Sequence, residues 1–277
     1  MTVRSLTARV HVAPPHCLIA ALVVFAGPAE AAPRAGPESC AASALREDRL
    51  QSLAPRGELV LASGVRAILA DIHWPETEPE ATQAASHLAD FRGRSLTISA
   101  RGEDDRWGRT RIEAVAGPAT DTDEPVDLAA DLVAAGLAQT DAGESDLICR
   151  ADLIALEAEP RAARRGVWRE AVRDARDGPA LVALAGRFVV AEGRIVGVGE
   201  RTERTYLDFV RNSAEGLTVI VSKRTWRIMR ERGLTASTLR GRLARVRGRV
   251  EVRRGPTLDI VSADMIEVLE GERAPRR

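Results

Sequence analysis

The sequence predicts a mainly β protein with interspersed helices, divided into two small domains. Its 277 residues are 45 % hydrophobic and 29 % charged, which is enough apolar material for packed cores and argues against general disorder. Short runs of β-branched and aliphatic residues recur along the chain and are separated by turn residues. Gly178 and Pro179 follow a helical stretch, and they mark the expected boundary between the domains.

The first domain is expected over residues 55–177, after a linker and N-terminal segment of residues 32–54. The turn residues 62–64 separate two apolar runs and therefore predict a hairpin. Gly136 and Gly166 each follow a helical pattern and predict the ends of two helices. The predicted strands cover residues 58–61, 65–72, 94–100 and 110–115, and the predicted helices cover residues 80–91, 128–135 and 152–165.

The second domain is expected over residues 186–270, with a tail of residues 271–277. β-branched runs dominate it, and one amphipathic stretch that ends at Gly233 predicts a single helix over residues 223–232. The predicted strands cover residues 188–198, 205–210, 217–221, 243–252, 257–261 and 266–269. Strands that enclose one helix are typical of a small Greek-key barrel of the OB type.

The N-terminal 31 residues have the pattern of a secretory signal peptide. Arg4 and Arg9 precede an apolar run over residues 17–26, and a small-residue cleavage site lies near Ala31. The run is shorter than a membrane-spanning helix requires. The pattern predicts a secreted or periplasmic protein, and the alternative is a misassigned start codon that adds a disordered leader.

Removal of such a signal leaves two cysteines, Cys40 and Cys149. In an oxidising compartment two thiols pair more often than they stay free, so the favoured hypothesis is a disulfide that ties the N-terminal segment to the first domain. The alternative is two unrelated thiols, one of them buried.

The chain has a formal net charge of zero, but its charges are unevenly distributed. Residues 32–185 hold 18 arginines against 27 acidic residues, whereas residues 186–277 hold 20 basic residues against 12 acidic ones. A basic second domain suits a polyanion, and it equally suits the acidic domain that precedes it.

Four segments of the first domain carry a family pattern, in order along the chain. They are Leu69–Glu76 (LADIHWPE), Asp105–Thr110 (DRWGRT), Leu132–Ala138 (LVAAGLA) and Leu156–Trp168, which holds E-A, A-A-R-R and G-V-W. They resemble, respectively, L-A-G-I-D-A-P-E, D-x-[YW]-G-R-x, L-V-x-x-G-L-A and E-A-x-x-A-[RK]-x-x-x-G-[LV]-W of the staphylococcal-nuclease-like, or thermonuclease, family. The resemblance implies an OB-type barrel with helices.

The resemblance also implies hydrolysis of phosphodiesters. In the family pattern two aspartates and a carbonyl hold Ca²⁺, a glutamate acts on the attacking water, and two arginines bind the phosphate. A hard cation prefers oxygen ligands, and paired guanidinium groups stabilise charge that develops on phosphoryl oxygens.

Only part of that set occurs in this sequence. Glu76 matches the glutamate and Arg109 matches the second arginine, although the two could also form a purely structural ion pair. An ungapped alignment puts Gly57 and His73 at the calcium aspartates and Ile68 at the first arginine. In the same alignment Glu58 falls at a threonine and Trp74 at the remaining ligand position. The ligand aspartates expected for Ca²⁺ are therefore absent.

Neighbouring residues could rebuild a site. Arg66 lies two residues before Ile68, so on a regular strand it faces the same side and could reach a phosphate. Asp71 is related to His73 in the same way, and together with Glu58 and Glu76 it could hold Zn²⁺ or Mn²⁺. The alternative is that these are solvated residues on a relaxed site.

Arginines also alternate along a predicted strand of the second domain. Arg245, Arg247 and Arg249 share one face of residues 243–252, which suits a phosphate backbone, and Tyr206 is the stacking candidate. A solvated strand face is the alternative. Through residues 193–196, 204–209 and 243–250 the domain resembles OB-type nucleic-acid-binding modules that are appended to thermonuclease-like domains.

The favoured hypothesis is an exported protein that binds nucleic acid, single-stranded DNA or RNA, and has a degenerate phosphodiesterase site. A second hypothesis is an active metal-dependent nuclease in which Glu76 is the base and Arg109 holds the phosphate. A third is a non-catalytic scaffold of the cell envelope whose domains bind proteins. Fold similarity cannot choose among the three, because function depends on the site.

Overall fold

The computed structural model describes residues 40–269, apart from residues 41, 121, 144–146 and 171. The expected signal peptide and the tail of residues 271–277 lie outside the described residues. The protein is mainly β, with 35 % strand and 24 % helix, as the sequence predicts. None of the helices in the described residues combines the length and apolar character needed to cross a membrane.

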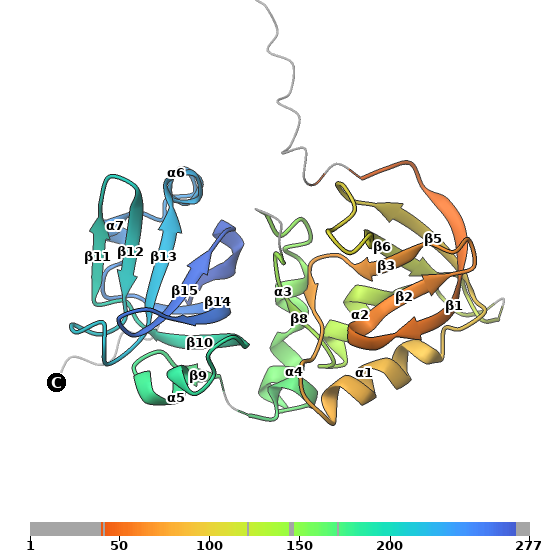
Figure 1. Cartoon of the computed structure of the whole chain (residues 1–277), viewed down its shortest axis with the longest axis horizontal. Coiled ribbons are helices and arrows are strands. Elements are labelled where there is room, and N and C mark those ends of the chain that lie inside the picture. The colour runs from red at the N-terminus through yellow and green to blue at the C-terminus, as the bar shows by residue number, and fades with distance from the viewer. Residues whose placement is uncertain (1–39, 41, 121, 144–146, 171, 270–277) are drawn as a thin grey trace, which may run out of the picture. The chain divides into compact units, whose positions relative to one another are not determined.

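The strands of the first lobe, defined as residues 42–169, close into a ring (Figure 1). The antiparallel order β3-β2-β1-β5-β6 is closed by a parallel pairing of β6 with β3. A closed ring leaves none of these five strands with an unpaired edge. The strands are β1 (Arg46–Ala54), β2 (Glu58–Leu61), β3 (Arg66–Leu69), β5 (Ser95–Ala100) and β6 (Thr110–Ala116). Short strands add to it: β7 (Val126–Asp127) pairs with β6, and β4 (Ile72–His73) pairs with β8 (Gln139–Thr140).

Helices complete the core of the first lobe. Helix α1 (Glu80–Ala89) buries Ala84 and Leu88 one turn apart, as expected for an amphipathic helix. Helix α2 (Leu128–Ala134) begins where the Asp127 carboxylate accepts a hydrogen bond from the amide of Ala130. Helices α3 (Leu153–Leu156) and α4 (Ala158–Ala162) follow, and three-residue 3₁₀ turns occupy residues 55–57 and 166–168.

The second lobe, defined as residues 173–269, contains the other large sheet. Its order is β11-β12-β13-β15-β14-β10-β9, and β16 also pairs with β14. The strands are β9 (Arg173–Asp174), β10 (Phe188–Arg194), β11 (Gly197–Glu200), β12 (Arg204–Asp208), β13 (Thr218–Ser222), β14 (Leu243–Val252), β15 (Pro256–Ile260) and β16 (Ile266–Val268). The helices are α5 (Gly178–Val182), α6 (Lys223–Glu231) and α7 (Ala236–Leu239), and residues 263–265 form a 3₁₀ turn.

The two lobes share one order of elements. Each has a bent first strand, two further antiparallel strands, a helix, and then two strands of which the last lies parallel to the third. In the first lobe the bend is a register shift between Leu50 and Ser52 of β1. In the second lobe it is the break between β10 and β11, so that β10 pairs with β14 while β11 pairs with β12.

Several boundaries differ from the sequence-based expectation. Residues 46–54 are strand β1 and not part of a linker, because Leu50 fills the core of the first lobe. The second lobe starts earlier than residue 186, since β9 pairs with β10 and Ala175 and Leu181 are buried in its core. The expected helix of residues 152–165 is divided at Glu157, whose side chain turns inward.

An ion pair with no exposed side-chain area joins the lobes. The guanidinium of Arg247 on β14 donates to both carboxylate oxygens of Glu157, at 2.7 and 3.0 Å. It also donates to the Thr140 carbonyl at 3.1 Å and to Glu267 at 2.5 Å. The amide of Thr140 donates to Glu157 in turn, at 2.7 Å. Burial opposes the charge of Arg247, but the two carboxylates outweigh it and raise its pKa.

The expectation that this row of arginines faces solvent is therefore wrong. Arg245, Arg247 and Arg249 do share one face of β14, but that face meets carboxylates. Arg245 is 8 % exposed and pairs with Glu192 and Glu267. Only Arg249, with 55 % of its side chain exposed, retains substantial access to solvent among the three.

Replacement of Arg247 should be severely destabilising, because it leaves the buried Glu157 carboxylate without its main partner. We expect Arg247→Met to lower the free energy of unfolding by about 3–5 kcal/mol in urea titrations, and Arg247→Met/Glu157→Gln to recover most of the loss. The control Arg249→Met removes a half-exposed pair and should change stability by no more than about 0.5 kcal/mol. Equal losses in the two single variants would contradict this account.

Candidate functional site

The predicted site residues are concentrated just after strand β3. This strand ends at Leu69 and β4 begins at Ile72, so Asp71 lies in the turn between them with a φ of 61°. The alternation of a regular strand is broken at this point. Asp71 and His73 therefore do not share a strand face, and the expectation that they do is wrong.

The Asp71 carboxylate binds backbone. It accepts hydrogen bonds from the amides of Cys149 and Arg150, each at 3.1 Å, and the Asp71 carbonyl accepts one from the amide of Asp141 at 3.0 Å. Burial raises the pKa of Asp71, and the two amide bonds counteract only part of that effect. Asp71 thus anchors the chain that leads into α3.

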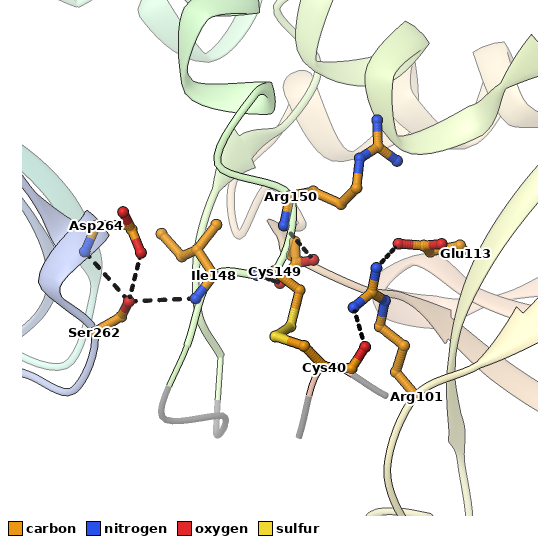
Figure 2. The surroundings of a disulfide bond; sticks show 9 residues. Cys40, Arg101, Glu113, Ile148, Cys149, Arg150, Ser262 and Asp264 are labelled. Carbon is orange, nitrogen blue, oxygen red and sulfur yellow. Dashed lines mark hydrogen bonds and ion pairs between the residues drawn. A yellow bond between two sulfur atoms is a disulfide. The ribbon is translucent and has the colours of Figure 1, made fainter. Parts of the chain in front are cut away.

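Cys40 and Cys149 form a disulfide, with their Cα atoms 5.5 Å apart, so the structure has the bond that the sequence favours. Figure 2 shows how the bond is embedded. Arg101 donates to the Cys40 carbonyl at 3.1 Å and also pairs with Glu113. On the other side, the amide of Ile148 donates to the Ser262 hydroxyl of the second lobe at 3.3 Å. The disulfide therefore holds the same segment that contacts the second lobe.

His73 and Glu76 face the second lobe. The imidazole of His73 stacks on the Phe188 ring with a centroid distance of 4.3 Å, and its Nδ1 lies 3.7 Å from the Asp141 carboxylate. Nε2 lies 3.6 Å from Glu76, whose carboxylate accepts a 2.9 Å bond from Arg249. The group aligned with the family's glutamate is thus engaged by an arginine of the second lobe.

Arg66 and Arg109 are each neutralised by a neighbouring carboxylate. Arg66 makes a bidentate pair with Glu58 at 2.6 and 2.8 Å. Arg109 contacts a single oxygen of Asp105, Oδ2, through Nε at 2.8 Å and Nη2 at 2.6 Å. No contact joins Arg109 to Glu76 in the described residues, so the structural ion pair considered for them is not formed. The two line different cavities: Glu76 lines one of about 450 Å³, and Arg109 lines another of about 140 Å³.

Gly57, the position aligned with the first calcium aspartate, has no room for a side chain because Trp74 lies against it. Gly57 is buried with a φ of 73°, and a Cβ atom there would lie 2.2 Å from Cε3 of Trp74. The Trp74 indole packs against the core of the first lobe and occupies the space that a carboxylate would need. No three His, Cys, Asp or Glu side chains gather into a metal-binding cluster in the described part of the chain. These residues do not fit the Ca²⁺ that the family pattern implies.

The stacking candidate Tyr206 is half-buried on β12, opposite Ile220 of β13. A more accessible aromatic residue is Trp107, with half of its surface exposed. The guanidinium carbons of Arg106 and Arg109 lie 4.0 and 4.8 Å from the centre of its ring. The family motif alone does not distinguish Trp107 as a contact residue, but an aromatic residue flanked by Arg106 and Arg109 in a turn is a signal for one.

The Trp107 turn has a fixed conformation. The Asp105 carboxylate accepts hydrogen bonds from the amides of Trp107 and Arg109, at 2.9 and 3.0 Å. Arg66 donates to the Trp107 carbonyl at 3.3 Å, and Gly108 supplies the positive φ of 71° that the turn requires. The backbone that carries the exposed indole is therefore held by these hydrogen bonds.

No family model matches this chain, and no curated protein matches it.

The raised pKa of Asp71 predicts a specific pH dependence. Between the pKa of an unfolded aspartate and the higher pKa of folded Asp71, the folded state binds more protons, so this residue's contribution to stability falls as pH rises. We expect the stability of the wild type relative to Asp71→Asn to decline across that window and then level off, measured by urea unfolding at a series of pH values. A relative stability that rises with pH would contradict the assignment.

Because Trp74 fills the space beside Gly57, we expect an aspartate at position 57 to destabilise the protein. Gly57→Asp combines a strained φ with a clash against Trp74, so the free energy of unfolding should fall by about 2–5 kcal/mol. Gly64→Asp is the matched control, because its φ is also positive but no atom lies within 4 Å of the added Cβ. Gly64→Asp should lower the free energy of unfolding only by the strain of a positive φ. A rise in Tm of Gly57→Asp on addition of CaCl₂ would show that calcium ligands can still assemble.

Proposed function

We propose that this protein binds single-stranded nucleic acid through the Trp107 turn and does not hydrolyse it. In this proposal both lobes are OB-type barrels, the first of them thermonuclease-like. The shared order of elements, with a helix between the third and fourth strands and one parallel pair, supports a Greek-key barrel of this type.

The exposed Trp107 indole is the observation that carries the proposal. Every base offers a flat π-face, so an accessible aromatic ring binds bases without sequence preference, at about 1–3 kcal/mol for each stacked base. Arg106 and Arg109 lie over this ring, so a base that stacks on it would share the face with a guanidinium group or displace it.

The cavity that Trp107 lines adds cationic groups. Arg101, Arg109 and Arg111 line it together with three aspartates, Asp71, Asp105 and Asp141. Two of these carboxylates, Asp71 and Asp105, accept hydrogen bonds from backbone amides. The sugar-phosphate backbone of a stacked nucleotide would lie near these guanidinium groups, of which Arg101 and Arg109 would first have to loosen their pairs with Glu113 and Asp105.

The contacts of the aligned residues argue against hydrolysis. Glu76 would have to leave Arg249 to act on a water molecule, and Arg109 would have to leave Asp105 to bind a phosphate. Gly57 and Trp74 supply no carboxylate for calcium.

Export remains a prediction, and it is supported by the Cys40–Cys149 disulfide, which persists in an oxidising compartment.

Replacement of Trp107 tests the binding surface. With 5′-labelled oligo-dT and oligo-U in fluorescence anisotropy, Trp107→Ala should weaken binding about 5- to 150-fold, the equivalent of one lost base stack. Trp107→Phe should retain most of the affinity, because it keeps an aromatic face. Wild-type protein that binds neither oligonucleotide would overturn the proposal in favour of a protein-binding scaffold.

The same oligonucleotides test catalysis. Incubation with Ca²⁺, Mn²⁺, Zn²⁺ or EDTA, analysed on denaturing gels, should leave them intact. Metal-dependent cleavage that disappears in Glu76→Gln would overturn the non-catalytic part of the proposal and establish a nuclease with an altered site.

A further inference from the structure

The outer face of helix α6 carries positive charge. Lys223, Arg227 and Arg230 are exposed and lie four and then three residues apart, which places them on one side of the helix. Arg224 is exposed as well and extends the basic surface at the start of the helix. Seven residues of an α-helix rise by about 10 Å, so the three cations form a stripe of about that length.

The orientation of this stripe is fixed by the opposite face of the helix. Thr225, Trp226 and Met229 are buried in the second lobe. The Trp226 Nε1 atom donates to Glu200 at 2.9 Å, and the Thr225 hydroxyl donates to the Val261 carbonyl at 2.9 Å. Ser222 caps the helix by accepting a hydrogen bond from the amide of Thr225. The helix therefore cannot rotate to remove its cations from solvent.

The charge of the stripe is poorly compensated within the protein. Lys223 and Arg230 form no ion pair with any residue in the described part of the chain, and Arg227 lies 3.9 Å from Glu231, at the limit of a contact. Arg232 and Arg253 of the second lobe have close carboxylates, Asp264 and Asp259. Arg211, Arg240 and Arg242 are exposed without an ion pair among the described residues, as Lys223 and Arg230 are, but the cations of α6 are aligned on one helix face. The arginines of β14, by contrast, meet carboxylates.

We propose that the α6 stripe is a second nucleic-acid contact that binds the phosphate backbone. The inference rests on the proposed function and deepens it by assigning a surface to the electrostatic part of the binding. Each nucleotide of a single strand carries one phosphate charge, so three cations spread over about 10 Å can contact consecutive phosphates of that strand. The exposed positions of α6 carry no aromatic ring, so the contact is expected to be independent of base sequence.

A nucleic acid fits this face better than a membrane surface does. Amphipathic helices that bind lipid bury an apolar face between the head groups and acyl chains. The large apolar residues of α6 are Trp226 and Met229, which are buried, and Ile228, which packs against the core of the second lobe. No apolar face of α6 is left for insertion.

The salt dependence of binding tests the inference. We expect Lys223→Gln/Arg227→Gln/Arg230→Gln to reduce the slope of log Kobs against log salt by about 2 for single-stranded oligonucleotides, because each lost phosphate contact removes about 0.7. Trp107→Ala should weaken binding and leave the slope unchanged. Far-UV circular dichroism and Tm verify folding, and Arg227→Lys/Arg230→Lys should keep the wild-type slope.

The matched control removes the same charge elsewhere in the second lobe. Arg204→Gln/Arg232→Gln/Arg253→Gln replaces three arginines that already have carboxylate partners, and it should keep nearly the wild-type slope. Equal slopes in the two triple variants would overturn the assignment to α6.

Two further outcomes separate this inference from the proposed function. If Trp107→Ala weakens binding but the α6 triple variant binds with wild-type affinity and slope, the inference fails and the proposed function stands. Loss of binding to phosphatidylserine vesicles in the α6 variant, with unchanged oligonucleotide binding, would assign the stripe to a membrane and overturn the inference.

Discussion

The bidentate contact between Arg247 and Glu157 determines where the rest of the candidate site lies. Neither side chain has any exposed surface, so each charge is tolerated only because the other is present. Glu157 also binds the amide of Thr140 in β8, the strand that pairs with β4. One buried pair thereby connects strand β14 to the segment that carries His73 and Glu76. In that segment His73 stacks on Phe188 and Glu76 pairs with Arg249 of the second lobe.

The residues that align with the thermonuclease pattern have structural partners in this chain. His73 and Glu76 contact the second lobe, Asp71 holds backbone amides next to the disulfide, and the Gly57 position is occupied by Trp74. These contacts explain why a chain with a family's folding motifs need not retain the chemistry of that family.

Local patterns predict the elements of this fold better than they predict the surroundings of its charges. Alternation gives β14 its bounds of Leu243–Val252, and helical spacing locates α6 to within a residue. The same alternation places three arginines on one face, but it cannot reveal that Glu157, 90 residues away from Arg247, meets that face. The break of the predicted helix at Glu157 likewise has no signal in the local pattern. The contact between Arg249 and Glu76 spans 173 residues and has no local signal.

The inward direction of the β14 arginines has a practical consequence for dissection of the protein. A fragment limited to the second lobe would lack Glu157 and Glu76, so Arg249 would lose its carboxylate partner and Arg247 would keep only Glu267. Such a fragment would bind polyanions through arginines that pair with carboxylates in the intact chain. Pull-down or crosslinking results obtained with truncated protein would therefore overstate affinity for nucleic acid, and only the undivided chain gives a valid measure of it.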